Sequence, residues 1–269
     1  AQYIMGLSAT PWSKEDQESQ AILKSYYGDI VAEYTLDDAL NDGILCPYSY
    51  HIHEVSMNHP EEEIYLKLTN QISAMYAKKM DQGLSAEERK MLEFLLFKRA
   101  RHLDAIEDKF ETLGKILATK KPAPYKLFYC GSGFQVDEEE ENITEEERLK
   151  TIDKITMILR DNGWKISKFT SDESHTTRIR VLQDFTNTKI DAIAAIKVLD
   201  EGFDIPMCNE AYITASSSNE RQWVQRRGRI LRTAEDKDSA IVHDFVITKT
   251  SEPKSFQSLV AKEIERMEA

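Results

Sequence analysis

Four arginines lie within seven residues, from Arg226 to Arg232, in a chain whose net charge is −12. Guanidinium groups present planar forks of hydrogen-bond donors that match the oxygens of a phosphoryl group. Arg229 and Arg232 are three residues apart, so a helix would place both on one face. The segment predicts a site for a multiply charged anion, where the arginines would stabilise charge during phosphoryl transfer. A solvated basic helix paired with acidic neighbours is the alternative.

A second candidate segment, residues 198–206, follows the most apolar strand expected in the chain. Within it, Gly202 permits close backbone approach, and Asp204 can accept hydrogen bonds from a ribose or a facing arginine. A Gly-Phe-Asp turn is ordinary loop chemistry when taken alone. Its position shortly before the arginine segment makes the pair informative.

These segments need a scaffold, and short apolar runs alternate with amphipathic ones after Pro122 and Pro124. This alternation is typical of a parallel sheet with helical crossovers. The expected strands are 126–130, 165–169, 191–198, 210–214 and 240–246, and the expected helices are 144–160, 174–186, 220–231 and one from 255. We therefore predict an α/β fold with a parallel sheet flanked by helices.

The stretch before this sheet, residues 58–119, has almost no helix breakers and carries apolar residues at helical spacing. Asn58 supplies a helix cap, and Ser85 with Glu88 opens a second helix. We expect a helical insertion of two or three long helices. Residues 29–55 are interpreted as connecting structure, with a short strand near 30–34, a helical turn over 36–41 and residues of alternating polarity over 49–55. The expected domains are 1–57, 58–121, 122–250 and a terminal helix over 251–269.

Several of these segments resemble the motifs of superfamily 2 helicases. Residues 225–232 resemble motif VI, which presents arginine fingers to ATP, and residues 198–206 resemble motif V. Residues 6–11 resemble motif III, and residues 128–132 resemble motif IV more weakly. The chain is most similar to the DNA-helicase branch that includes restriction-system motors and repair helicases, and the helical insertion is covered least.

The resemblance implies a RecA-like domain preceded by the helical insertion and the end of a first RecA-like domain. It also implies an ATP-dependent helicase or translocase that acts on DNA, with RNA not excluded. The implied catalytic residues are Arg229, Arg232 and Gln225. Those implied for nucleotide binding or coupling are Ser8, Thr10, Glu201, Gly202 and Asp204. Those implied for nucleic-acid contact are Gly131, Ser132, Thr170, Arg178 and Lys197.

A complete motor also needs a glycine-rich phosphate loop and an acidic magnesium motif. None of the ten glycines begins such a loop. The Asp172–His175 stretch has the Asp-Glu-x-His pattern of the magnesium motif, but it follows the segment that resembles motif III instead of preceding it. We interpret this stretch as a helix cap. We expect ATP and Mg²⁺ to be bound with an N-terminal RecA-like domain outside this chain, and the chain alone to be inactive. The alternative is a non-catalytic binding module that retains the fold.

Composition limits the remaining possibilities. A net charge of −12 indicates that any phosphate contact is local. His51 and His53 lack a third ligand at fitting spacing, so no metal site is predicted. The three cysteines are far apart and set among apolar residues, which favours a reducing, cytoplasmic compartment. No apolar stretch approaches the ~18 residues that a membrane span needs.

Overall fold

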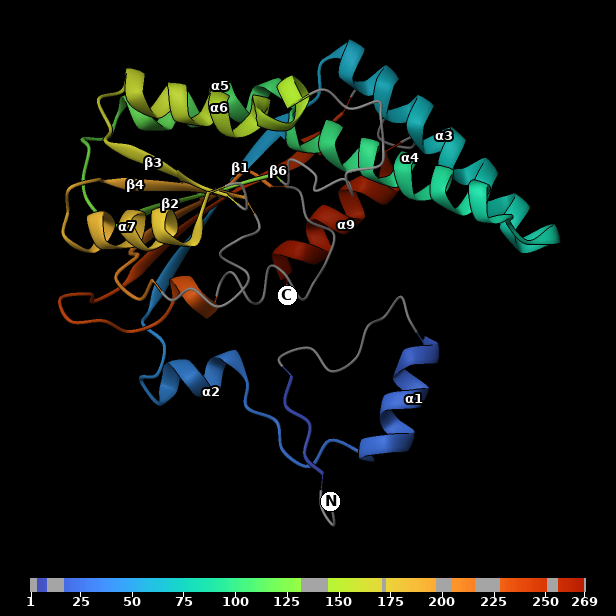
Figure 1. Ribbon diagram of the computed structural model, residues 1–269, viewed down its shortest axis with the longest axis horizontal. Helices are drawn as coiled ribbons and strands as arrows, with labels where there is room; N and C mark the ends of the chain where they lie inside the picture. The colour runs from blue at the N-terminus through green and yellow to red at the C-terminus, as the bar shows by residue number, and fades with distance from the viewer. Residues whose placement is uncertain are drawn as a thin grey trace.

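The computed structural model describes residues 4–8, 17–131, 145–170, 173–196, 205–215, 228–250 and 256–268. Within these residues, a six-stranded sheet has the order β1-β6-β5-β2-β4-β3, and every neighbouring pair is parallel (Figure 1). The strands are β1 (Tyr48–Ser56), β2 (Lys126–Cys130), β3 (Ile166–Phe169), β4 (Ala192–Ile196), β5 (Glu210–Ile213) and β6 (Ala240–Lys249). The predicted parallel sheet flanked by helices is confirmed.

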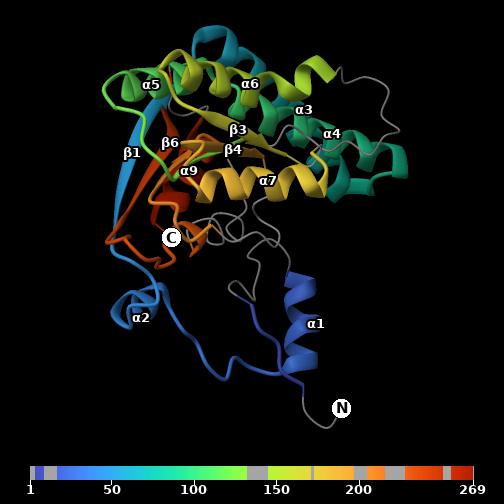
Figure 2. The same ribbon diagram turned by 60° about the vertical axis from the view of Figure 1, so that its left-hand side comes forward.

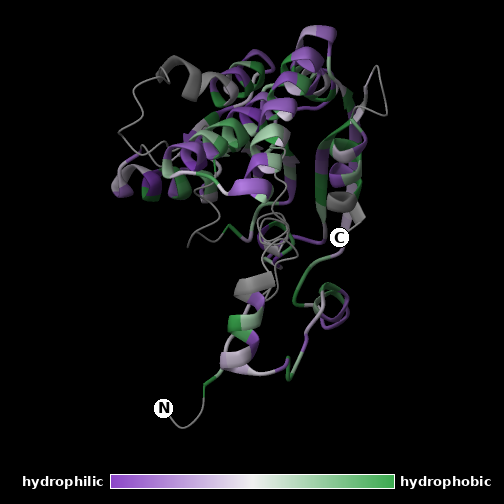
Figure 3. Cartoon of the chain, turned by 90° about the vertical axis from the view of Figure 1, so that its right-hand side faces the viewer, coloured by the Kyte–Doolittle hydropathy of each residue, from purple (hydrophilic) through white to green (hydrophobic). Residues whose placement is uncertain are grey.

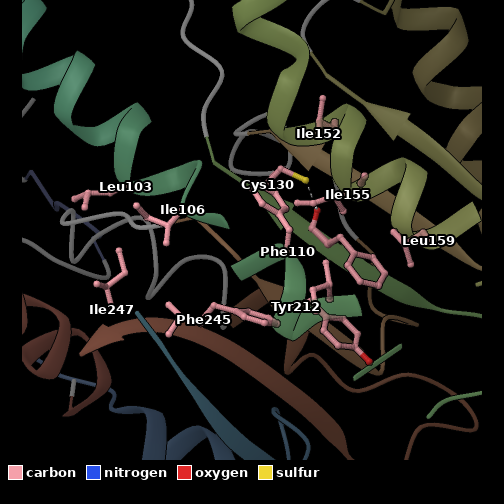
Figure 4. Close-up of a cluster of buried hydrophobic side chains, with 14 of the residues drawn as sticks. Leu103, Ile106, Phe110, Cys130, Ile152, Ile155, Leu159, Tyr212, Phe245 and Ile247 are labelled. Atoms are coloured by element: carbon pink, nitrogen blue, oxygen red, sulfur yellow. Dashed lines mark hydrogen bonds between the residues drawn. The ribbon is translucent and has the colours of Figure 1, made fainter. Parts of the chain in front are cut away.

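Helices cover both faces of the sheet, as the near-continuous apolar runs of β2 and β4 require. The helices α5 (Glu107–Ala118) and α6 (Glu145–Asp161) lie on one face, and α7 (His175–Thr186) lies on the other (Figures 1 and 2). Successive side chains of β2 point to opposite faces, so Phe128 joins the α5–α6 core while Leu127 joins the α7 core. The α5–α6 core appears in Figure 4, where Ile152 and Ile155 of α6 lie over β2.

Two long helices, α3 (His59–Gln82) and α4 (Ala86–Asp104), form a hairpin that extends away from the sheet (Figure 1). Both begin with the capping residues predicted from the sequence, Asn58 and Ser85, each in a complete capping box. The hairpin has its own small core, formed by Leu68, Ile72, Leu84, Leu92 and Leu95. The third helix of this stretch, α5, packs on the sheet, so only α3 and α4 project.

The last helix, α9 (Gln257–Glu268), joins the base of the hairpin to the sheet. Phe256, just before it, stacks on Tyr65 of α3 with ring centroids 5.4 Å apart. The Glu263 carboxylate accepts a hydrogen bond from the Ile247 amide of β6 at 3.4 Å. No helix among the described residues is long and apolar enough to cross a membrane.

The N-terminal part contains α1 (Gln17–Tyr27) and α2 (Leu36–Asn41), which lie apart from the sheet in both ribbon views. Thr35 and Asp38 form a capping box that begins α2. Apolar side chains of α1 are largely exposed, with Ile22 at 62% and Tyr26 at 63%, and green segments mark this helix in Figure 3. The α1 region thus contributes little to the core.

Two expectations about residues 29–55 differ from the structure. Residues 30–34, expected as a short strand, form none. Residues 49–55, interpreted as connecting structure, belong to β1, which pairs in parallel with β6 from Tyr48 to Ser56. The strand forms because β6 offers a neighbour with free backbone groups, and that neighbour is remote in the sequence. The division of the chain into domains stays a prediction.

Candidate functional site

The carboxyl ends of the parallel strands meet at one edge of the sheet, where ligands of open α/β sheets bind. Gly131, Thr170 and Thr214 directly follow β2, β3 and β5, so the structure brings all three to this edge. The segment after β4, residues 197–204, lies outside the described residues. Two of the predicted nucleic-acid contacts, Gly131 and Thr170, therefore share one edge.

Gly131 is buried against Asp104, the last residue of α4. A Cβ atom at position 131 would lie 2.1 Å from the Asp104 Cγ atom and 2.3 Å from its Cβ atom. Any side chain at position 131 would collide, so the close approach of α4 to the sheet edge requires glycine. Burial, with the nearby charge of Asp104, raises the pKa of the Cys130 thiol, which therefore stays protonated.

A fully buried lysine, Lys109, lies beneath the same edge. Its Nζ atom donates a hydrogen bond to the Thr214 carbonyl at 2.9 Å, and the Thr214 hydroxyl donates to the Tyr129 carbonyl at 3.0 Å. Burying a cation costs free energy, and hydrogen bonds such as the one to Thr214 offset part of that cost. The sequence reasoning missed Lys109. The signal was a charged residue on the buried face of α5, beside Phe110, Leu113 and Leu117.

Thr170 and Arg178, the other predicted strand contacts, are joined through Glu173. The Glu173 carboxylate accepts hydrogen bonds from the Thr170 amide and from its hydroxyl, the latter at 2.7 Å. The Arg178 Nε atom donates to the Glu173 carbonyl at 3.1 Å. Ser174 caps α7, which agrees with the interpretation of residues 172–175 as a helix start.

The arginine segment is described from Gly228 onward. Residues 228–230 are helical, Arg229 is partly buried, and Ile230 and Leu231 are completely buried in the α7 core. Arg232 is exposed and forms an antiparallel bridge with Leu45, so it lies beyond the helical turn. The expectation that one helix places Arg229 and Arg232 on one face is therefore wrong. The described helix ends at Ile230, and Arg232 instead pairs in extended form with Leu45, which precedes β1.

The stretch that precedes β1 contacts the arginine segment at a second residue, next to the Leu45–Arg232 bridge. The Cys46 amide donates a hydrogen bond to the Leu231 carbonyl at 2.8 Å. A lysine that the sequence reasoning missed, Lys237, contacts carbonyls at the end of the same segment. The segment is thus fixed by its buried apolar side chains and by its backbone.

The remaining predicted residues are placed less fully. Ser8 is exposed in a segment without helix or strand. The predicted residues that lie outside the described part of the chain are Thr10, Ser132, Lys197, Glu201, Gly202, Asp204 and Gln225. Among the described residues, no cluster of three or more His, Cys, Asp or Glu side chains could hold a metal ion.

A second charged cluster lies toward the amino ends of the strands. Glu210 opens β5 and is held by Lys120, by the Lys126 Nζ atom at 3.1 Å and by the His243 Nε2 atom at 3.0 Å. The Tyr212 hydroxyl donates to the same carboxylate at 2.8 Å. Burial disfavours the charged form, but these donors hold the pKa of Glu210 well below its usual range. The cluster is separate from the carboxyl edge, which indicates a structural role.

Residues 108–234 match the family model described as the helicase conserved C-terminal domain. The chain is 28% identical over 261 residues to the DNA 3'-5' translocase XPB2 of Sulfurisphaera tokodaii, covering 92% of this chain and 53% of that protein. It is 25% identical over 103 residues to putative helicase 22 of a Sulfolobus islandicus filamentous virus, covering 37% of this chain and 18% of that protein. The chain thus spans about half the length of the archaeal relative.

Among solved structures, the C-terminal part of the Fun30 ATPase domain is similar in fold. The TM-score is 0.50 with 14% identity, covering 80% of this chain and 90% of that structure. At this identity the likeness concerns the fold alone. It supports the arrangement of a parallel sheet between helical layers.

Proposed function

We propose that the chain is the carboxy-terminal half of an ATP-dependent DNA translocase or helicase of superfamily 2. The match of residues 108–234 to the helicase conserved C-terminal domain supports this proposal. The observation that carries the proposal is the anchoring of Arg229 and Arg232. Ile230 and Leu231, between them, are completely buried. A rigid support of this kind suits groups that must meet a phosphoryl oxygen at a fixed geometry.

In this proposal, a second RecA-like domain binds ATP with a glycine-rich loop, and this chain closes onto it. Arg229 and Arg232 stabilise the negative charge that develops on the transferred phosphoryl group, and Gln225 assists at the same site. Bound Mg²⁺ would neutralise phosphate charge from the other domain. The nucleotide state would be transmitted between the domains by one coupling group, Ser8, Thr10, Glu201, Gly202 and Asp204.

Nucleic-acid contact is assigned to the carboxyl edge of the sheet. Backbone amides at Gly131 and Ser132 and the cations of Arg178 and Lys197 would contact phosphates. The Thr170 hydroxyl would join them only after it releases the Glu173 carboxylate, to which it donates in this structure. Such contacts position a strand without reading its sequence. A local grip of this kind is compatible with a net charge of −12. The similarity to an archaeal DNA translocase favours DNA as the nucleic acid.

The test is DNA-stimulated ATP hydrolysis by the polypeptide that joins this chain to the proposed nucleotide-binding domain. Arg229→Ala and Arg232→Ala are each expected to lower turnover by ~10³-fold or more, the typical effect of an arginine finger. Arg160→Ala is the matched control, because Arg160 is an exposed arginine in the last turn of α6. Parental turnover in both finger variants would refute the assignment.

The second candidate function is a binding module that keeps the fold without catalysis. The projecting α3–α4 hairpin favours this alternative, because it offers a surface remote from the sheet. The two functions differ in the joined polypeptide, since a pure binding module would bind DNA without hydrolysing ATP. The 269-residue chain alone is expected to show no ATPase in either case.

A further inference from the structure

Lys237 makes three hydrogen bonds to backbone carbonyls. Its Nζ atom donates to the Ile230 carbonyl at 2.6 Å, to the Arg232 carbonyl at 2.7 Å and to the Pro206 carbonyl at 3.0 Å. An ammonium group has three donors and no acceptor, so all of its hydrogen-bonding capacity is used within the protein. The Lys237 side chain is therefore held in one place instead of extending into solvent.

A tight turn directs this lysine back toward the arginine segment. The Lys237 amide donates to the Ala234 carbonyl at 3.2 Å. Asp236 has a φ of 62°, in the left-handed region that aspartate tolerates better than most residues. The turn reverses the chain within a few residues of Arg232, so Lys237 can reach the carbonyls that precede it.

The three carbonyls come from two different segments. Ile230 and Arg232 lie at the end of the arginine segment, whereas Pro206 ends the segment that resembles motif V. Carbonyls at the end of a helix lack intrahelical partners and carry partial negative charge, which a cation stabilises. Lys237 thus supplies hydrogen-bond donors to the carbonyls at the end of the arginine segment and links that segment to Pro206.

We propose that Lys237 is a positioning residue that sets the placement of Arg229 and Arg232 relative to the loop ending at Pro206. The inference rests on the proposed function, because it assigns Lys237 an effect on the same ATP site. Lys237 itself does not touch the nucleotide. It acts through the backbone from which the two arginines project.

The distinguishing prediction concerns turnover rather than substrate binding. A displacement of ~1 Å at a catalytic group can lower the rate by ~100-fold. Lys237→Met keeps most of the length of the side chain but removes its donors. In the joined polypeptide, this variant is expected to lower the DNA-stimulated kcat by roughly 10- to 100-fold while KM for ATP stays near the parental value.

A double-mutant cycle with Arg232→Ala separates positioning from a general structural effect. If Lys237 acts through the arginine, Lys237→Met will add little to the loss already caused by Arg232→Ala. The matched control is Lys189→Met, which removes a lysine whose side chain is 68% exposed and pairs with Asp184 at 3.0 Å. This control is expected to leave kcat unchanged.

The outcomes distinguish the two proposals. Parental turnover in Arg232→Ala would count against the proposed function itself. An impaired Arg232→Ala beside a normal Lys237→Met would overturn the Lys237 inference alone, as would losses that multiply in the double variant. If Lys237→Met does not fold, Lys237→Gln is measured in the same cycle, because its neutral amide has two donors in place of three. A partial loss of kcat that Arg232→Ala masks would support the inference, and a parental kcat would overturn it.

Discussion

The buried carboxylate of Glu210 offers a test of stability, and the perturbation is Glu210→Gln. Its side chain is 6% exposed, and that of its partner Lys126 is 11% exposed. Lys120, the other lysine partner, is 30% exposed. Glutamine keeps the shape of the side chain but removes the negative charge that both ammonium groups face. Lys120 can turn toward water, whereas Lys126 is left buried with its charge uncompensated.

The expected magnitude follows from this asymmetry. Removing one partner of a buried ion pair costs about 3–5 kcal/mol, because the other charge stays desolvated. Since one of the two lysines can rehydrate, we expect a value near the lower limit, about 3 kcal/mol. For a chain of this size, such a loss lowers Tm by roughly 6–12 °C.

The assay is urea and thermal unfolding of the 269-residue chain at neutral pH. Glu111→Gln is the control, because Glu111 is 58% exposed and its contact with Lys115 is 3.7 Å long. An exposed pair of this kind contributes about 0–1 kcal/mol. A Glu210→Gln variant as stable as this control would refute the reasoning. The pKa of Glu210 is lowered on folding. The difference in the free energy of unfolding between the parental chain and Glu210→Gln should therefore shrink as the pH falls below the usual glutamate pKa.

Three further predictions concern single residues. Gly131→Ala should cost about 1–3 kcal/mol, because the new Cβ collides with Asp104, and an unchanged urea midpoint would contradict this close approach. Lys109→Met should cost at least about 1 kcal/mol, because the Thr214 carbonyl loses its buried donor, and thermal unfolding would detect the change. Burial lowers the pKa of His53 to about 4. The unfolded chain then binds a proton at higher pH than the folded one, so stability falls between pH 7 and pH 5. Because the His53 ring is only partly buried and solvent screens its charge, we expect a loss of no more than about 1 kcal/mol. A His53→Gln variant with the parental pH slope would rule out this contribution.

Much of the fold could be predicted because its signals are local. The strand over 126–130 and the helix over Leu36–Asn41 have the bounds expected from the sequence, since prolines, caps and apolar runs mark them. The sheet position of β1 could not be predicted in this way. Its alternating pattern indicates a strand, but the partner strand, β6, is chosen by packing across a large sequence separation.

The candidate site also combines features with a local sequence signal and features that depend on long-range contacts. The charge cluster around Arg229 stands out in an acidic chain, so the sequence alone singles out this segment, and its role at an ATP site stays a prediction. The bonds made by Lys237 were not, because they end on backbone carbonyls, which leave no trace in the pattern of side chains. The ion pairs of Glu210 were missed for a related reason. Their members, Lys120 and Lys126, come from a loop and a strand that only the folded sheet brings together.

The pairing of β1 with β6 has a consequence for protein synthesis. His53 and His243, in contact across these strands, are 190 residues apart. At ~5–20 residues per second, roughly 10–40 seconds pass between their translation. The α3–α4 hairpin can form in that interval from local contacts, whereas β1 must wait with unpaired backbone groups. An unpaired strand can associate with other chains, so β1 is most exposed to aggregation until β6 leaves the ribosome.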